Sequence, residues 1–138
     1  METLLKLSKL KEAYSVEGNV TKCNVTYKIV VNSSIPMDFG FAIEEKIGKI
    51  FRKYHKCSKD LVFNITSTAT CSESDSFDET VGKKLAHSKN ETTAYLLLSR
   101  ATEELGDFLT KLEDMAIDFY NKFAVIVDRE CEYQESFE

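Results

Sequence analysis

A heptad repeat of apolar residues in the C-terminal third of the chain constrains its fold more than any other feature. Apolar residues recur there at intervals of three and four, with one final gap of seven: Leu98, Ala101, Leu105, Phe108, Leu112, Met115, Phe119 and Ile126. Lys122 is the one polar residue at a seam position. This spacing is typical of a helix that pairs with another helix. It predicts a helix over 91–127, within a C-terminal helical part that covers 77–127.

The predicted helix is long for a domain of this size, which suggests that it associates with a second copy. At 1.5 Å per residue it exceeds about 50 Å. We therefore expect a dimer or higher oligomer, with an interface formed by Leu98, Leu105, Phe108, Leu112, Met115 and Phe119. The alternative is that the helix folds back on a helix expected at 39–55. The residues 123–127 are also compatible with a strand, and the acidic tail over 128–138 is expected to fray.

Two segments of the N-terminal half alternate between apolar and polar residues and are predicted to be strands. The first covers 20–32 and the second covers 61–71. One face of the first strand is apolar, with Cys23, Val25, Tyr27, Ile29 and Val31, and the matching face of the second has Leu61, Phe63, Ile65, Ala69 and Cys71. Because each strand has one apolar and one polar face, we expect a small antiparallel sheet covered by helices on one face.

The remaining elements are predicted from caps and turns. A short helix is expected at 3–13, with Thr3 as its N-cap and leucines on adjoining turns, followed by a short strand at 14–17. Gly18-Asn19 is a two-residue hairpin signal. A helix at 39–55 is expected to be capped by Asp38.

Two capping boxes occur before the C-terminal helix. The first, Ser76 to Glu79, predicts a helix start near Phe77, and the second, Ser88 to Glu91, predicts a break near 87–90. Together these elements predict an α+β fold in a single domain over 1–138. Its parts are a sheet-and-helix part at 1–76, the helical part at 77–127 and the acidic tail.

Composition excludes several classes of function. The chain has 138 residues and a formal net charge of −5, so we expect no nucleic-acid partner, which would need a basic stripe. No apolar run approaches the roughly 20 residues of a membrane span, and the N-terminus lacks the layout of a secretory signal. These features predict a cytoplasmic protein with no membrane partner.

The four cysteines show no paired spacing, so they are expected to be reduced and to bind no metal. The alternative metal site combines His55 and Cys57 with Cys23 or Cys71. A competing feature is that five asparagines fit the N-glycosylation pattern: Asn19, Asn24, Asn32, Asn64 and Asn90. A secreted, glycosylated, disulfide-bonded domain therefore stays as a third hypothesis.

No catalytic motif accompanies the two histidines, His55 and His87. We therefore expect neither an enzyme nor a cofactor. Basic residues do gather around the expected helix junction, where free N–H groups at 90–92 would suit a phosphate. The predicted ligand-binding residues are Lys84, His87, Asn90 and Arg100.

One stretch of 18 residues resembles a known family. Ala69-Thr70-Cys71 is followed by Asp75-Ser76-Phe77-Asp78 and then by Gly82, Leu85 and Ala86. This order is similar to a pattern in small proteins of bacteriophages and prophages, among them the phage anti-Thoeris proteins that act as sponges for cyclic ADP-ribose signals. These relatives often continue with Arg-Ala, whereas this chain continues with His87-Ser88.

The resemblance implies a dimer with nucleotide pockets between chains and a phage-type protein that sequesters a cyclic nucleotide or cyclic ADP-ribose without turnover. Its ligand would be a nucleotide-like small molecule. The alternative function is a structural or protein-interaction module that pairs through the C-terminal heptad helix.

Overall fold

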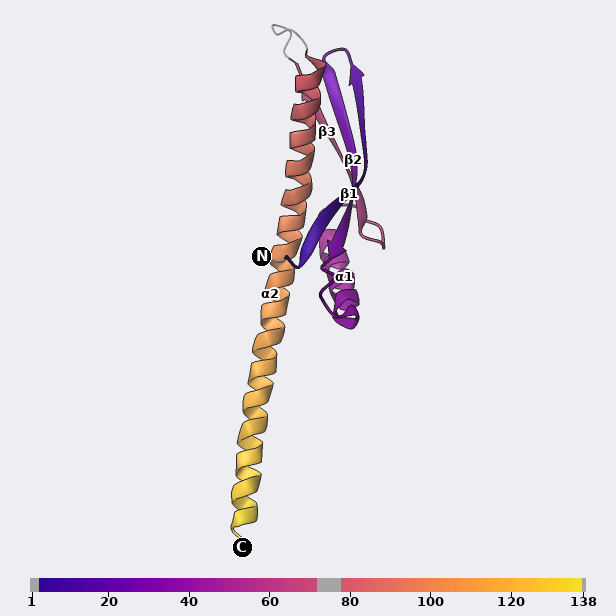
Figure 1. The fold of residues 1–138 in the computed structure, drawn as a ribbon. Coiled ribbons are helices and arrows are strands. Elements are labelled where there is room, and N and C mark those ends of the chain that lie inside the picture. The colour runs from indigo at the N-terminus through magenta and orange to yellow at the C-terminus, as the bar shows by residue number, and fades with distance from the viewer. Residues whose placement is uncertain (1–2, 72–77, 138) are drawn as a thin grey trace. The chain divides into compact units, whose positions relative to one another are not determined.

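The chain builds a three-stranded antiparallel sheet and two helices, which confirms the predicted α+β class. The computed structural model describes residues 3–71 and 78–137. The elements are β1 (Leu5–Glu17), β2 (Val20–Val31), α1 (Met37–Phe51), β3 (Val62–Thr70) and α2 (Glu79–Glu135). The strand order is β1-β2-β3, with antiparallel pairs throughout (Figure 1).

Strand β1 replaces the short helix that the sequence predicted at 3–13. The strand pairs with β2 from Leu5 opposite Val31 to Glu17 opposite Val20, and its register shifts between Lys9 and Lys11. Leu4, Leu7 and Leu10 follow one another at a helix-like spacing, and the strand accommodates Leu10 as the unpaired residue of this bulge. The predicted hairpin is confirmed at Gly18, whose φ of +58° suits a residue without a Cβ.

The predicted apolar faces of β2 and β3 are confirmed. On β2, Cys23, Val25, Tyr27 and Ile29 are buried, and Phe63, Ile65 and Ala69 of β3 are buried on the same side. The opposite side carries a polar ladder in which Asn24 and Asn64 exchange hydrogen bonds of 2.8 and 2.7 Å. Tyr27 and Phe63 stack with ring centroids 5.4 Å apart.

Helix α1 covers one end of the apolar face. Its buried residues include Ile47, Ile50 and Phe51, and the Phe51 ring lies 4.6 Å from that of Phe63. The helix begins at Met37 after Pro36, so the predicted cap by Asp38 is wrong, and Asp38 lies in the first turn instead. There its negative charge still suits the helix dipole.

Helix α1 also ends earlier than predicted, at Phe51. Arg52 then donates to the carbonyl oxygens of Cys57 and Ser58, at 3.0 and 2.8 Å, and so ties down the loop that follows.

Helix α2 is a single helix from Glu79 to Glu135, so the predicted break near 87–90 is wrong. Its cap is Asp78, whose Oδ1 accepts hydrogen bonds from the backbone N–H groups of Thr80 and Val81. The predicted start near Phe77 lies outside the described residues. The expected fraying of the tail is also wrong, because the helix continues through 128–135.

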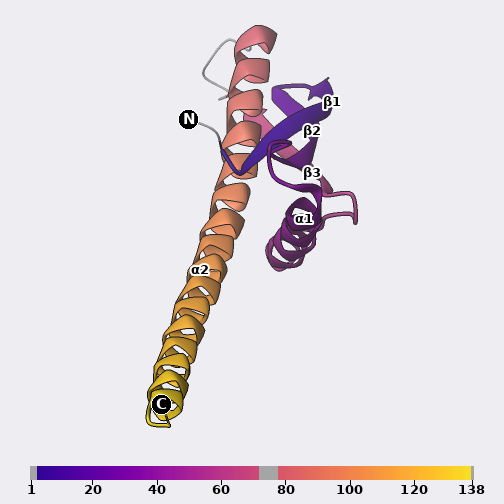
Figure 2. The same ribbon diagram turned by 60° about the horizontal axis from the view of Figure 1, so that its bottom comes forward.

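The N-terminal part of α2 lies against the apolar face of the sheet, as Figures 1 and 2 show. Ala86, Asn90, Ala94 and Ala101 are fully buried on this side of the helix. Small side chains allow the helix backbone to approach the strands closely, and Ser67 of β3 donates a hydrogen bond of 2.6 Å to the Ala86 carbonyl. Helices α1 and α2 thus cover the same face, as predicted.

The chain divides into two compact units, residues 1–102 and residues 103–138. The first holds the sheet, α1 and the start of α2. The second holds the rest of α2. Among the described residues, no helix combines the length and apolar content needed to cross a bilayer.

Candidate functional site

Six polar side chains meet where α2 crosses β1 and β2, and we call them the His87 cluster. They are Lys9, Glu12 and Tyr14 of β1, Cys23 of β2, and His87 and Glu91 of α2. His87 and Glu91 are one helical turn apart, so both point to the same strand pair. On β1, Glu12 and Tyr14 share one face because they lie two residues apart.

His87 lies at the centre of this cluster. Its Nδ1 is 2.7 Å from Oε1 of Glu12, and its Nε2 is 3.1 Å from Oε1 of Glu91. The ammonium group of Lys9 lies 2.6 Å from Oε1 of Glu91 and 3.2 Å from Nε2 of His87. One imidazole ring therefore contacts carboxylates from two different elements.

Tyr14 contacts both Glu12 and His87. Its hydroxyl donates a hydrogen bond of 2.5 Å to Glu12 and lies 3.3 Å from Nδ1 of His87. Burial raises the pKa of the Tyr14 hydroxyl, and burial also raises the pKa of the Cys23 thiol. Both groups are therefore protonated at neutral pH.

The carboxylates of the cluster are held in their charged forms. The hydrogen bond from Tyr14 lowers the pKa of Glu12, and the hydrogen bond from Lys9 lowers the pKa of Glu91. The same contact raises the pKa of Lys9. The cluster thus presents two carboxylates and one ammonium group around the His87 ring.

A hollow of about 370 Å³ lies beside the cluster. It is lined by Glu12, Tyr14, Thr80, Lys83, Lys84 and His87. Lys83 lies 3.0 Å from Glu79 and 5.9 Å from the centre of the Tyr14 ring, while Lys84 is exposed. Two of the four predicted ligand residues, Lys84 and His87, therefore line one hollow.

The other two predicted ligand residues lie elsewhere. Asn90 is fully buried, and its amide bonds Tyr27, the Cys23 carbonyl and the Ile65 carbonyl. In this structure it is inaccessible to a nucleotide and to a glycan. Arg100 is exposed and does not line the hollow. The N–H groups at 90–92 lie inside a continuous helix, where they bond the carbonyls four residues earlier.

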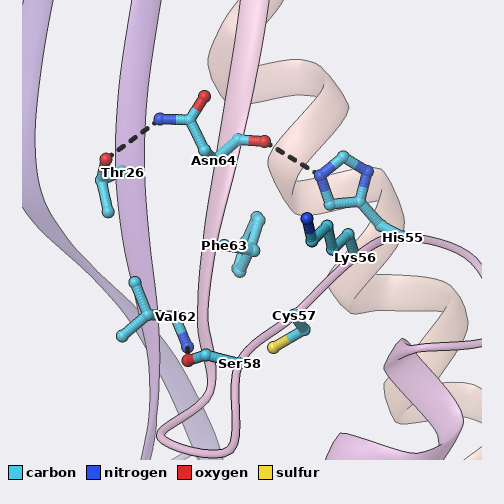
Figure 3. A pocket seen from close by; sticks show the side chains of 8 residues that line it. All are labelled: Thr26, His55, Lys56, Cys57, Ser58, Val62, Phe63 and Asn64. Carbon is cyan, nitrogen blue, oxygen red and sulfur yellow. Dashed lines mark hydrogen bonds between the residues drawn. The ribbon is translucent and has the colours of Figure 1, made fainter.

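A second hollow, of about 560 Å³, lies beyond the end of α1 and against β3 (Figure 3). His55 and Cys57 both line it, and Nε2 of His55 donates to the Asn64 carbonyl at 2.9 Å. The sequence suggested that these two residues join Cys23 or Cys71 around a metal. Within residues 3–71 and 78–137, the group of three ligand-type side chains that includes Cys23 contains Glu12 and His87 instead.

The predicted oligomer interface divides into a buried and an exposed part. Leu98 and Leu105 are buried within one chain, and Phe108 is half-buried. Leu112, Met115 and Phe119 are exposed, with 45%, 65% and 61% of their surface accessible. A partner can therefore reach the predicted seam only in its C-terminal portion.

No family model, curated protein or solved structure matches this chain.

Sequence reasoning missed Lys9, Glu12, Tyr14 and Glu91. Lys9 and Glu12 were predicted to lie in the helix at 3–13. That helix would have pointed their side chains away from the partners that they contact as part of β1. One pattern was visible in the sequence: Glu91 follows His87 by four residues, a spacing that puts both on one helix face.

Proposed function

We propose that the chain is a non-enzymatic protein-interaction module that self-associates through the C-terminal part of α2. The observation that carries this proposal is the exposure of every described residue from Leu109 to Phe137. Large apolar side chains make up much of this surface: Leu109, Leu112, Met115, Ile117, Phe119, Tyr120, Phe123, Val125, Ile126, Val127 and Tyr133.

A single helix with this surface needs a partner. Isolated helices draw little stability from propensity alone and depend on packing of an apolar face. Monomeric proteins rarely expose continuous apolar patches larger than a few hundred Å². The alternative from the sequence is that the helix folds back on α1 and buries these side chains within one chain, which would leave the protein monomeric.

A second copy of the chain is the partner that the spacing favours. Leu112, Met115, Phe119 and Ile126 continue the heptad spacing, which lets two identical helices interlock side chains. In a two-fold dimer both chains contribute the same patch to the interface, so the stripe of one chain packs against the stripe of the other.

The test is the mass of the full chain by sedimentation equilibrium at tens of micromolar. We expect a dimer or higher oligomer. The double variant Met115→Asp and Phe119→Asp should be monomeric, because two buried charges per chain would oppose pairing.

Lys111→Asp with Asp114→Lys is the matched control, since it changes exposed residues outside the stripe and keeps the net charge. It should assemble as the parent does. A monomeric parent would contradict the proposal, and so would a double variant that keeps the parent's mass.

Capture of a cyclic nucleotide or cyclic ADP-ribose stays a prediction. Its support is the hollow in which Lys83, Lys84 and His87 meet. Calorimetry with cyclic nucleotides and cyclic ADP-ribose isomers tests it, with Lys84→Ala as the variant that should weaken binding. Arg100→Ala is the comparison, because Arg100 was predicted to bind but lies outside the hollow.

A further inference from the structure

Three different ligand atoms meet in the His87 cluster. Glu12, Cys23 and His87 place a carboxylate oxygen, a sulfur and an imidazole nitrogen within 4.8 Å of one another. They come from β1, β2 and α2, so the grouping arises from the tertiary fold and not from neighbours on one helix. We propose that these three side chains bind a divalent transition metal ion, with Zn²⁺ as the expected ion.

The donor types favour zinc over the harder cations. Zinc binds cysteine sulfur at about 2.3 Å and histidine nitrogen or carboxylate oxygen at about 2.0–2.2 Å. Magnesium and calcium prefer sites made of oxygen atoms alone. A thiolate from Cys23 and the carboxylate of Glu12 also balance the two positive charges of the ion. The loaded site is then neutral, which suits its partly buried position.

The contacts of the two ring nitrogens of His87 resemble those of a histidine that binds a metal ion. Its Nδ1 faces Glu12, and its Nε2 lies 3.1 Å from the carboxylate of Glu91. Ligating histidines commonly donate their other ring N–H to a carboxylate, which fixes both the tautomer and the ring orientation. With Nδ1 on the metal, the Nε2–H donates to Glu91, so Lys9 no longer donates to Nε2 and keeps its 2.6 Å contact with the Glu91 carboxylate.

The observed geometry must adjust at two places to become tetrahedral. The Cys23 sulfur, which lies within 4.8 Å of the other two ligand atoms, must lie about 3.6 Å from them, and Glu12 and His87 must move apart. Oε1 of Glu12 and Nδ1 of His87 are 2.7 Å apart, as a hydrogen-bonded pair. Two ligands at zinc bond lengths in a tetrahedral site lie about 3.3 Å apart. Glu12 is exposed, so its carboxylate has room to move by this amount. Binding releases the thiol proton of Cys23 to solvent, and the ring proton that His87 shares with Glu12 leaves Nδ1, so the hydrogen bond between the two side chains is replaced by bonds to the ion.

The hollow beside the cluster provides an entry path and a fourth position. Glu12, Tyr14 and His87 line it directly, so an ion can reach two of its three ligands from solvent. Three protein ligands leave one coordination position for water.

The experiment is a titration of the full-length, chelator-treated chain with Co²⁺ under reducing conditions, followed by displacement with Zn²⁺. We expect one equivalent of Co²⁺ per chain, a near-ultraviolet thiolate-to-cobalt absorption and the strong visible bands of a four-coordinate ion. Cys23→Ser should abolish the near-ultraviolet band. Glu91→Gln should weaken binding by about 10–100-fold, because Glu91 orients the histidine without touching the ion.

The matched control replaces the other three cysteines together, Cys57→Ser, Cys71→Ser and Cys131→Ser, and should keep the full cobalt spectrum. X-ray absorption of the zinc-loaded parent is the second measurement, since it needs no folded variant, and should show one sulfur with nitrogen or oxygen neighbours. Absence of a thiolate–cobalt band, its survival in Cys23→Ser, or its loss in the triple control would each overturn the proposal. So would a zinc shell without sulfur.

Discussion

Asn90 shows how one buried side chain fastens α2 to the sheet. Its Oδ1 accepts a 2.6 Å hydrogen bond from the Tyr27 hydroxyl, and its Nδ2 donates to the carbonyls of Ile65 and Cys23 at 2.7 and 3.2 Å. Asn90→Ala would leave these three buried groups without that partner. Because each unsatisfied group costs about 1–3 kcal/mol, we expect the free energy of unfolding to fall by about 3 kcal/mol or more. Urea denaturation of the full chain measures it.

The control for this prediction is Asn24→Ala, which removes the same amide from the exposed ladder opposite Asn64. Water replaces those hydrogen bonds, so the loss should stay below about 1 kcal/mol. Equal losses in the two variants would show that the bonds of Asn90 do not fasten α2. Adding Tyr27→Phe to Asn90→Ala should restore part of the loss, since it removes one of the unsatisfied groups.

The role of Asn90 also shows where residue-level prediction failed. Its basic neighbours suggested a ligand site, whereas its place on the helix points it into the core. Ala86, Asn90, Ala94, Leu98 and Ala101 follow one another at helical spacing, and this stripe was visible in the sequence. The cluster around His87 was not, because its partners on β1 depend on a strand pairing that no local pattern specifies.

At the scale of elements, the alanines of α2 set its distance from the strands. Ala94 is fully buried, so Ala94→Leu adds three carbon atoms where there is no space. We expect this variant to lose about 1–3 kcal/mol of stability through overpacking. Ser99→Leu adds a leucine at an exposed position of the same helix and should change stability by less than about 0.5 kcal/mol. Thermal unfolding measures the stability of both variants. An Ala94→Leu variant with unchanged stability would show that α2 contacts the strands more loosely than we infer.

Strands in which apolar and polar residues alternate without a break were predictable from the sequence, and elements in which this pattern is interrupted were not. The alternation in β2 and β3 identified both strands and their buried faces. In β1 the bulge between Lys9 and Lys11 broke the alternation, and the leucine spacing indicated a helix instead. The second capping box, from Ser88 to Glu91, predicted a break, but packing of the surrounding residues on the sheet keeps α2 continuous. Tertiary contacts there outweigh a local capping preference.

At the scale of the whole molecule, two basic residues indicate how a pair of α2 helices would run. Lys122 occupies a seam position, and Arg129 follows it by one heptad. In a parallel, in-register pair each seam residue faces its own copy, which would place Lys122 against Lys122 and Arg129 against Arg129. An antiparallel pair avoids both contacts, because Lys122 then faces an apolar residue and extends its ammonium group to water. We therefore expect antiparallel pairing.

Spin labels on Cys131 measure this orientation. Cys131 is exposed, whereas Cys23 is fully buried and should stay unlabelled once Cys57→Ser and Cys71→Ser are introduced. In a parallel pair the two labels lie beside each other, separated only by the width of two helices. In an antiparallel pair centred between Met115 and Lys122, residue 131 lies opposite a position at least about 20 residues earlier. At 1.5 Å per residue this offset alone is about 30 Å. Pulsed electron resonance separates these cases, and a short distance between the labels would contradict antiparallel pairing. Lys122→Leu should weaken the preference, because it removes one of the two like-charge contacts that disfavour the parallel pair.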